Sequence, residues 1–108
     1  MKYALVAKVE GKTLTLQVSG ELTREVTDQF RREVAAMLKA DLLRVEVNCR
    51  DLTFVDSSGL GAFIFLRKRA CEAGGQLYLT EIKGWLLKFL QVTGLEETFM
   101  SPERKVRG

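Results

Sequence analysis

Two hydrophobic periods alternate along this sequence, and that alternation constrains the fold more than any single residue does. Apolar residues alternate with other residues from Tyr3 to Val9 and again from Leu14 to Val18, with Gly11-Lys12 between the two runs. This pattern is typical of an antiparallel hairpin. From Arg24 to Ala40 the apolar residues instead recur at three- and four-residue steps, which predicts an amphipathic helix with Thr23 as its N-cap.

The alternation continues to the end of the chain and gives the order ββαβαβαβ. In the next predicted strand Arg44 and Glu46 face one side of the sheet, whereas Leu43, Val45 and Val47 face the other. Strands that alternate with helices at short intervals favour a mainly parallel sheet joined by right-handed crossovers. The fold class is therefore α/β, with the opening hairpin as an antiparallel edge. The later elements are predicted as a strand at 42–47, a helix after Leu52, Phe54, Val55 and Asp56 that ends at Gly74-Gly75, a strand at 76–80, a helix at 85–91 with Trp85, Leu86, Phe89 and Leu90 turned inward, and a last strand at 97–100.

Composition bounds the kind of protein this can be. With 108 residues and 46% hydrophobic content, the chain fits a single domain spanning 1–108 that buries a core without metal or disulfide support. Cys49 and Cys71 show no C-x-x-C spacing and the chain has no histidine, so we expect two buried, reduced thiols and no metal site. The longest uncharged run, 57–66, falls far short of the roughly 20 residues that span a bilayer.

The charge distribution and the N-terminal sequence bear on nucleic-acid binding and on cellular location. The net charge is +3, and much of the excess of basic residues lies at 67–69 and at 104–107. No nucleic-acid motif accompanies these residues, so direct DNA binding is not expected. Lys8 and Glu10 interrupt the apolar N-terminal stretch that a signal peptide would need. We therefore expect a cytoplasmic protein that is not transmembrane.

Gly59 and Gly61 break a local rule, because each lies in the first turn of a predicted helix and costs about 1 kcal/mol relative to alanine there. Close packing of the helix on the sheet is one explanation. The other is access, since another molecule's backbone could approach a helix start that lacks side chains. Asp56, Ser57 and Ser58 are the candidate N-caps.

Two enzymatic interpretations of this segment are weak. Gly59-Leu60-Gly61 lacks the third glycine of a dinucleotide fingerprint and is not followed by Gly-Lys-Ser/Thr. Ser57 and Ser58 have no histidine to activate them and no Gly-x-Ser-x-Gly elbow around them, although a lysine base stays open. We therefore expect no enzyme activity and no cofactor.

The segment Asp51-Leu52-Thr53-Phe54-Val55-Asp56-Ser57-Ser58-Gly59-Leu60-Gly61 resembles the STAS family, in particular bacterial anti-sigma-factor antagonists. Val18-Ser19-Gly20-Glu21-Leu22 resembles the family's Gly-Glu-Leu element, and Val92-Thr93-Gly94-Leu95 resembles its later helix-to-strand turn. The resemblance covers nearly the whole chain. It implies a four- or five-stranded sheet with helices packed on one side.

The resemblance also implies a function. In such antagonists a partner kinase, itself the anti-sigma factor, phosphorylates the second serine of Asp-Ser-Ser-Gly, which maps the acceptor onto Ser58, with Ser57 as the second choice. The unphosphorylated protein binds the kinase and frees the sigma factor, and a serine phosphatase is a further expected partner. The implied partner-binding residues are Glu21, Thr23, Asp56, Ser57, Ser58, Gly59, Leu60 and Gly61.

One residue departs from the family pattern. Many antagonists carry aspartate after Gly-Glu-Leu, where this chain has Thr23, and that loop is expected beside the serine site. Other STAS proteins work without phosphorylation, as subunits of lipid-transport ATPase complexes or as stressosome-type scaffolds. The lipid-transport role is the main alternative.

Overall fold

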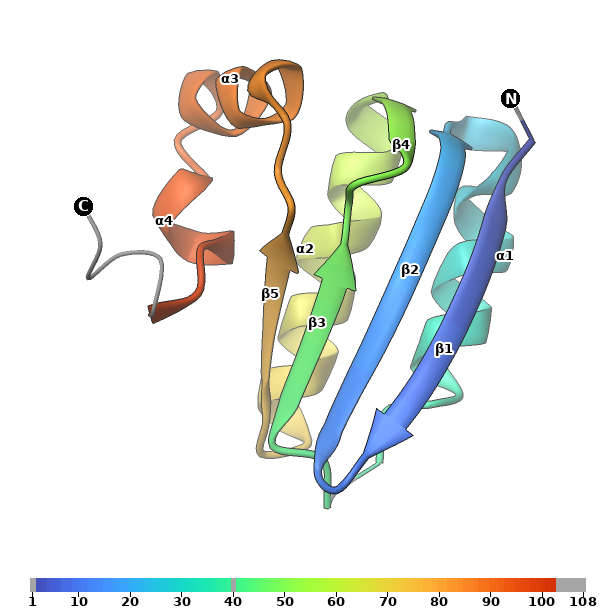
Figure 1. The fold of residues 1–108 in the computed structure, drawn as a ribbon, viewed down its shortest axis with the longest axis vertical. Helices are drawn as coiled ribbons and strands as arrows, with labels where there is room; N and C mark the ends of the chain where they lie inside the picture. The colour runs from blue at the N-terminus through green and yellow to red at the C-terminus, as the bar shows by residue number, and fades with distance from the viewer. Residues whose placement is uncertain (1, 40, 103–108) are drawn as a thin grey trace.

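The computed structural model describes residues 2–39 and 41–102 and contains one sheet of five strands. The strands lie in the order β1-β2-β3-β5, and β4 pairs with the far end of β2 (Figure 1). β1 and β2 are antiparallel, and all other pairs are parallel. The predicted α/β class and the antiparallel edge hairpin are thus confirmed. The elements are β1 (Ala4–Glu10), β2 (Thr13–Leu22), α1 (Arg24–Ala35), β3 (Arg44–Asn48), β4 (Leu52–Val55), α2 (Ser57–Glu72), β5 (Gln76–Thr80), α3 (Gly84–Val92) and α4 (Glu96–Phe99).

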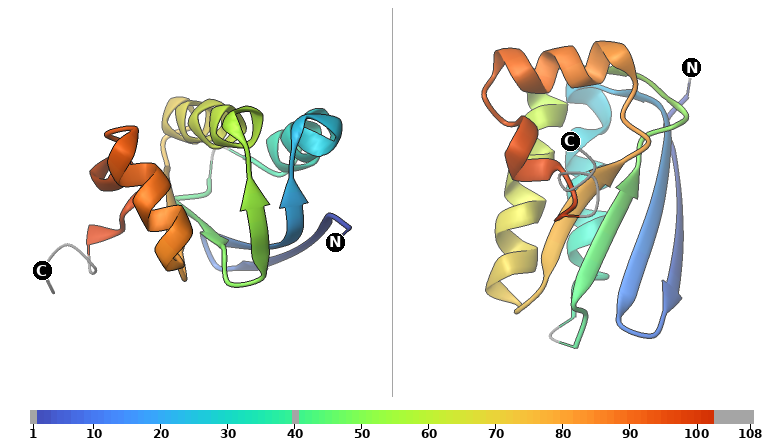
Figure 2. Two further views of the ribbon diagram at one scale, coloured as in Figure 1. Left: turned by 90° about the horizontal axis from the view of Figure 1, so that it is seen from above. Right: turned by 60° about the vertical axis from the view of Figure 1, so that its left-hand side comes forward.

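The helices α1 and α2 lie side by side on one face of the sheet, and α3 and α4 lie at the β5 edge (Figure 2). Alternation along each strand sends one set of side chains into this layer, as in β2, where Leu14, Leu16 and Val18 are buried. A row of edge-to-face rings then crosses the layer. Its centroid distances are 6.2 Å from Tyr3 to Phe30, 5.8 Å from Phe30 to Phe63 and 6.3 Å from Phe63 to Phe99.

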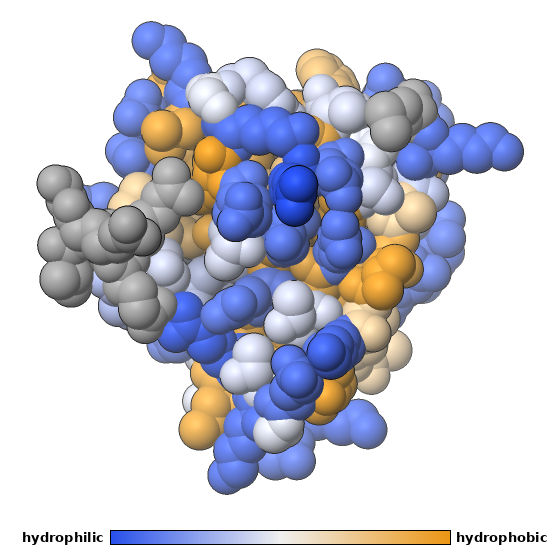
Figure 3. Space-filling model, viewed as in Figure 1, coloured by the Kyte–Doolittle hydropathy of each residue, from blue (hydrophilic) through white to orange (hydrophobic). Residues whose placement is uncertain are grey.

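The opposite face of the sheet is turned to the viewer in Figure 1, with α1 and α2 behind it, and is largely hydrophilic at its centre (Figure 3). Arg44 and Glu46 of β3 lie on it as predicted, with 2.6 Å between Nε and Oε2. The Arg44 guanidinium also stacks on the ring of Tyr78 at 4.8 Å. The buried apolar layer therefore lies on the helix side of the sheet, while Val6 and Phe54 are among the apolar side chains that stay exposed.

The predicted elements differ from the structure in type, in length and by one missing strand. Residues 97–100 were expected to form a strand, but Glu96–Phe99 is helix α4, because Phe99 N–H donates to Leu95 O and the buried Phe99 ring meets Phe63. The α1 helix ends at Ala35 rather than at residue 40. A separate strand, β4, was not predicted, because its four residues are too few to show a recognisable alternation.

Two side chains also differ from expectation. Trp85 was placed inward but is 37% exposed, since Leu86 and Leu90 already fill the buried face of α3. Leu43 was placed on the buried face of a strand but precedes β3 and is 59% exposed. Residue 40 and the basic cluster at 104–107 lie outside the described residues.

The two cysteines differ in exposure, which corrects the expectation that both are buried. Cys49 is 1% exposed, whereas Cys71 is only partly buried, with its Sγ 3.7 Å from Oε1 of Gln76. Burial raises the pKa of Cys49 from 9.0 to about 12, because the low-dielectric interior disfavours the thiolate. This thiol therefore leaves the free energy of unfolding unchanged below about pH 9 and lowers it as the pH rises toward 12.

We predict that a thiol reagent at pH 8 modifies Cys71 in the folded protein at least tenfold faster than Cys49. The reason is that Cys49 must be exposed by unfolding before its thiolate can form. Peptide mass spectrometry of a time course, repeated in denaturant, measures both rates. Equal labelling of the two thiols in the folded chain would contradict the burial of Cys49.

Candidate functional site

Asp56 is the N-cap of α2. Its backbone is extended, with φ −93°, and its Oδ1 accepts the Gly59 N–H at 2.9 Å. Its carbonyl oxygen accepts the Leu60 N–H at 3.0 Å. Of the three candidate caps in the sequence, Asp56 is the one whose side chain accepts an unpaired amide donor of the first turn.

The same carboxylate also reaches the first residue of α1. Its Oδ2 accepts the Arg24 N–H at 3.2 Å, and the Asp56 N–H donates to Leu22 O at 3.3 Å. The starts of two helices that are distant in sequence are thereby held together at one half-buried side chain. Both helix starts carry a partial positive charge, which a carboxylate stabilises.

The two glycines of the first turn have different surroundings. A Cβ added to Gly59 would lie 2.5 Å from Leu22 O and 2.8 Å from Cγ1 of Val55, so Gly59 permits close packing. A Cβ added to Gly61 would meet nothing within 4 Å. The packing explanation thus holds for Gly59, whereas Gly61 leaves open space on the outer face of α2.

Thr23 stands at the N-cap position of α1, but its side chain does not cap the helix. Its hydroxyl donates to Oε2 of Glu25 at 2.8 Å, and this hydrogen bond lowers the pKa of the exposed Glu25 carboxyl. Its carbonyl oxygen accepts bonds from the N–H groups of Val26 and Thr27 and from the Thr27 hydroxyl, the last at 2.6 Å. The predicted side-chain cap at Thr23 was therefore wrong, because the hydroxyl is taken by Glu25.

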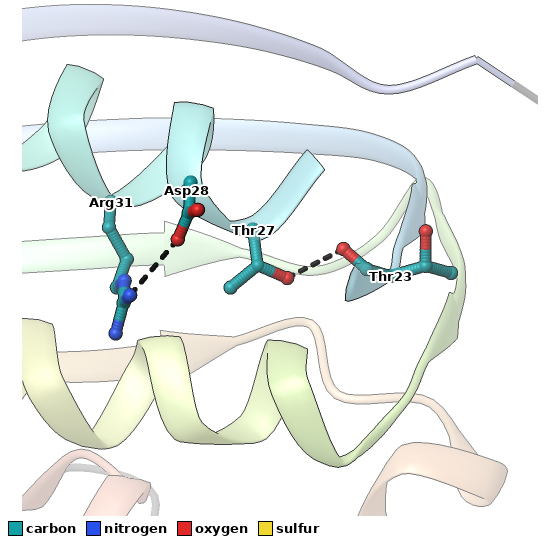
Figure 4. Close-up of polar contacts among 4 residues, drawn as sticks. All are labelled: Thr23, Thr27, Asp28 and Arg31. Atoms are coloured by element: carbon teal, nitrogen blue, oxygen red, sulfur yellow. Dashed lines mark hydrogen bonds and ion pairs between the residues drawn. The ribbon is translucent and has the colours of Figure 1, made fainter. Parts of the chain in front are cut away.

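A groove runs between α1 and α2 at their N-terminal ends. Its volume is about 370 Å³, and we call it the α1–α2 groove. Figure 4 shows Arg31 extending from α1 toward α2, with its Nη2 3.0 Å from Oδ1 of Asp28. A second hollow of about 300 Å³ shares Asp28 and Arg31 and continues to Arg32, Ala35 and Phe65. The α1–α2 groove is lined by Arg24, Thr27, Asp28, Arg31, Ser58 and Gly61.

The groove is predominantly basic. Arg24, Arg31 and Arg32 line the two hollows together with a single acid, Asp28. The guanidinium of Arg31 also lies over the Phe65 ring at 5.2 Å, and that of Arg69 lies over the same ring at 5.8 Å. Such stacking holds the cationic groups near the surface of α2.

The predicted site residues divide into two groups in the structure. Ser58 and Gly61 line the α1–α2 groove, and Asp56 and Gly59 build the turn beside it. Leu60 is 6% exposed and shapes the surface from within. The others do not line the groove: Ser57 is exposed at the start of α2, Thr23 is partly buried beside α1, and Glu21 is exposed opposite Phe54 in the β2–β4 pair.

Sequence reasoning missed the contribution of α1. Arg24, Thr27, Asp28 and Arg31 follow the spacing of one helical face, and that spacing was the available signal. It could not show which face would meet Ser58.

The described residues contain no group of histidine, cysteine, aspartate and glutamate side chains placed to hold a metal ion. Within the same ranges, no helix has the length and apolar character needed to cross a membrane.

Comparisons with known proteins agree on one family. The family model described as "Mlab, STAS domain" matches residues 6–102. A STAS-domain containing protein of Pseudomonas aeruginosa strain UCBPP-PA14 is 26% identical over 99 residues, which are 92% of this chain and 97% of that protein. An anti-sigma F factor antagonist of Paenibacillus polymyxa is 26% identical over 83 residues, covering 76% of this chain and 71% of its own length.

A solved structure shares the fold. The unphosphorylated form of the anti-sigma factor antagonist SpoIIAA superposes with a TM-score of 0.76 at 22% identity, over 97% of this chain and 93% of that one. The sheet order and the placement of helices on one face are therefore those of a known fold.

We predict that the two glycines respond oppositely to alanine. Gly59→Ala should lower the free energy of unfolding by roughly 1–3 kcal/mol, because the methyl group collides with the Leu22 backbone. Gly61→Ala should raise it by up to about 1 kcal/mol, because an exposed helical position gains propensity. Urea unfolding of the matched pair measures both, and a larger loss at Gly61 would contradict the assignment of packing to Gly59.

Proposed function

The chain belongs to the STAS domain family, and we propose that it is an anti-sigma factor antagonist that binds a kinase-type anti-sigma factor through the α1–α2 groove. In this proposal the unphosphorylated protein holds the kinase and frees a sigma factor in the cytoplasm. Phosphorylation of Ser58 ends the complex, and a serine phosphatase restores it. The observation that carries the proposal is that the Ser58 side chain lines an open groove beside the bare backbone of Gly61.

The groove suits a protein partner for a steric reason. Gly61 has no neighbour within 4 Å of a would-be Cβ, so a partner's main chain can approach α2 closely at that point. The Phe65 ring lies farther along the same helix and offers an apolar contact next to Arg31. Aromatic and arginine side chains are the types that dominate binding energy at protein interfaces.

Ser58 suits the role of switch better than Ser57. Ser58 lines the groove and is half-buried, so a phosphate on its oxygen would occupy the space that a partner must fill. Ser57 is exposed and does not line it. A phosphoserine carries a charge of about −1.5 to −2 at pH 7, and burying such a charge unpaired in an interface costs several kcal/mol.

The domain acts in this proposal as a regulator and not as an enzyme. The chain has no histidine to activate either serine. Asp56, the nearest carboxylate in sequence, has both of its oxygens engaged by backbone N–H groups. The phosphoryl transfer is therefore assigned to the partner kinase.

A second candidate function follows from Thr23. Antagonists commonly carry aspartate at this position, whereas the Thr23 hydroxyl here is bonded to Glu25. This favours a STAS protein that works without phosphorylation, either as a subunit of a lipid-transport ATPase complex or as a stressosome-type scaffold. Binding to a transporter ATPase subunit, with no modification of Ser58 by anti-sigma kinases and ATP, would decide for this alternative.

We predict that Ser58→Asp weakens binding to the cognate anti-sigma kinase at least tenfold, which corresponds to 1.4 kcal/mol. The added carboxylate would have to be desolvated in the interface. Ser58→Ala should bind like the unmodified protein and resist phosphorylation, whereas Ser57→Ala should still be phosphorylated. Calorimetry against the anti-sigma kinases of the same genome measures the affinities, and mass spectrometry after incubation with ATP identifies the acceptor.

Gly61→Val supplies the structural control, because the added side chain would project into open space. It should weaken the complex more than it lowers the stability of the free protein.

Normal kinase binding by Ser58→Asp, or phosphorylation confined to Ser57, would overturn the assignment of the switch.

A further inference from the structure

Two arginines line the α1–α2 groove together with Ser58, and the proposed function gives them no part in the phosphorylated state. Arg24 and Arg31 lie about two helical turns apart on one face of α1, with Thr27 between them. All three line the same hollow as Ser58. Guanidinium groups are the side chains best suited to pair with phosphate, because their parallel N–H donors match two phosphate oxygens.

Both arginines can be recruited by a new anion. Arg24 forms no ion pair within 4.0 Å with any other residue in 2–39 and 41–102, and its electrostatic interaction is with the fully exposed carboxyl of Glu25. Arg31 is paired with Asp28, but their side chains are 40% and 75% exposed, and ion pairs that exposed to water are weak. A phosphate of nearly two negative charges would compete with one exposed carboxylate for Arg31.

We propose that phosphoserine at position 58 folds into the α1–α2 groove and is bound there by Arg24 and Arg31 of the same chain. The proposal rests on Ser58 being the modified residue, as in the proposed function, and it adds a receiving site for the phosphate. The two arginines then have a different partner in the unphosphorylated and in the phosphorylated protein. In the unphosphorylated protein they are open to acidic groups of a partner, and after phosphorylation they are occupied.

The charges around the groove are compatible with this arrangement. From α1 the facing groups are Arg24, Asp28 and Arg31, and from the start of α2 the facing group is Asp56. Asp56 opposes the phosphate, but its two oxygens are already engaged by the N–H groups of Gly59 and Arg24. Glu25 lies on α1 beside Thr23 and holds the Thr23 hydroxyl. The groove volume of about 370 Å³ leaves room for a phosphate group.

The switch would then act in two ways at once. The phosphate fills the space over Gly61 that a partner backbone needs, and it withdraws two arginines from the partner's carboxylates. A buried, repelling charge alone would leave those arginines free. Phosphorylation therefore blocks the α1–α2 groove and engages its arginines, in addition to adding negative charge.

The test installs phosphoserine at position 58 during synthesis of the full chain, so that no kinase is needed. Phosphorus NMR then follows the second ionisation of the phosphate, whose ordinary pKa is about 6. Nearby guanidinium groups favour the dianion, so we expect this pKa to fall to about 5 in the wild-type sequence. Arg24→Gln and Arg31→Gln should each return it part of the way toward 6, and the double variant should raise it further than either single variant, leaving only the effect of the α2 start.

Two matched controls separate pairing from general charge. Arg32→Gln removes a neighbouring arginine that does not line the α1–α2 groove, and it should leave the low pKa nearly unchanged. Phosphoserine placed at position 57 instead shares the start of α2 but lies outside the α1–α2 groove, so its pKa should not respond to Arg24→Gln or Arg31→Gln. As a second readout, the Nε–H resonances of Arg24 and Arg31 should shift when Ser58 is phosphorylated, and that of Arg32 should not.

A phosphate pKa near 6 that neither arginine variant alters would overturn the proposal, as would an equal response to Arg32→Gln. These outcomes differ from a failure of the proposed function. A chain that binds no anti-sigma kinase could still show the arginine-dependent pKa, and a chain that binds one could lack it.

Discussion

The surface of this domain depends on one carboxylate that serves two helices. Asp56 accepts the N–H of Gly59 with one oxygen and the N–H of Arg24 with the other. A helix start has unpaired donors that must find acceptors, and here two starts share the same acceptor. Asp56 thereby ties the start of α1 to the start of α2, and the α1–α2 groove, lined by Ser58, Arg24 and Gly61, lies beside this tie.

The three residues of the Gly59-Leu60-Gly61 segment have different surroundings. Gly59 lets the first turn of α2 rest on the backbone of Leu22 and on Val55, which brings α2 to the end of β2. Leu60 then enters the core, and Gly61 leaves the outer side bare. Within one helical turn the sequence anchors the helix on its inner side and keeps its outer side accessible.

The sequence predicted most of the fold because its periods are local properties. The opening hairpin, the two long helices, the strands at β3 and β5 and the polar pair Arg44 and Glu46 need only residues that are near each other in the chain. What failed depends on distant contacts. Residues 96–99 are helical because Phe99 packs against Phe63. A segment of four residues shows no hydrophobic period from which this contact could be predicted. The arginines of the groove were missed for the same reason, since only folding places α1 against Ser58.

The most direct test of this account is hydrogen exchange at single amides in the wild type and in Asp56→Ala and Asp56→Asn. If one carboxylate ties both helix starts, Asp56→Ala should speed exchange at the Gly59 and Arg24 amides together while the amides of β2 and β3 keep their protection. Asp56→Asn, with a single carbonyl oxygen, should retain protection at only one of the two. Faster exchange at Gly59 alone in Asp56→Ala would show that the α1 start is held by other contacts and would contradict the shared cap.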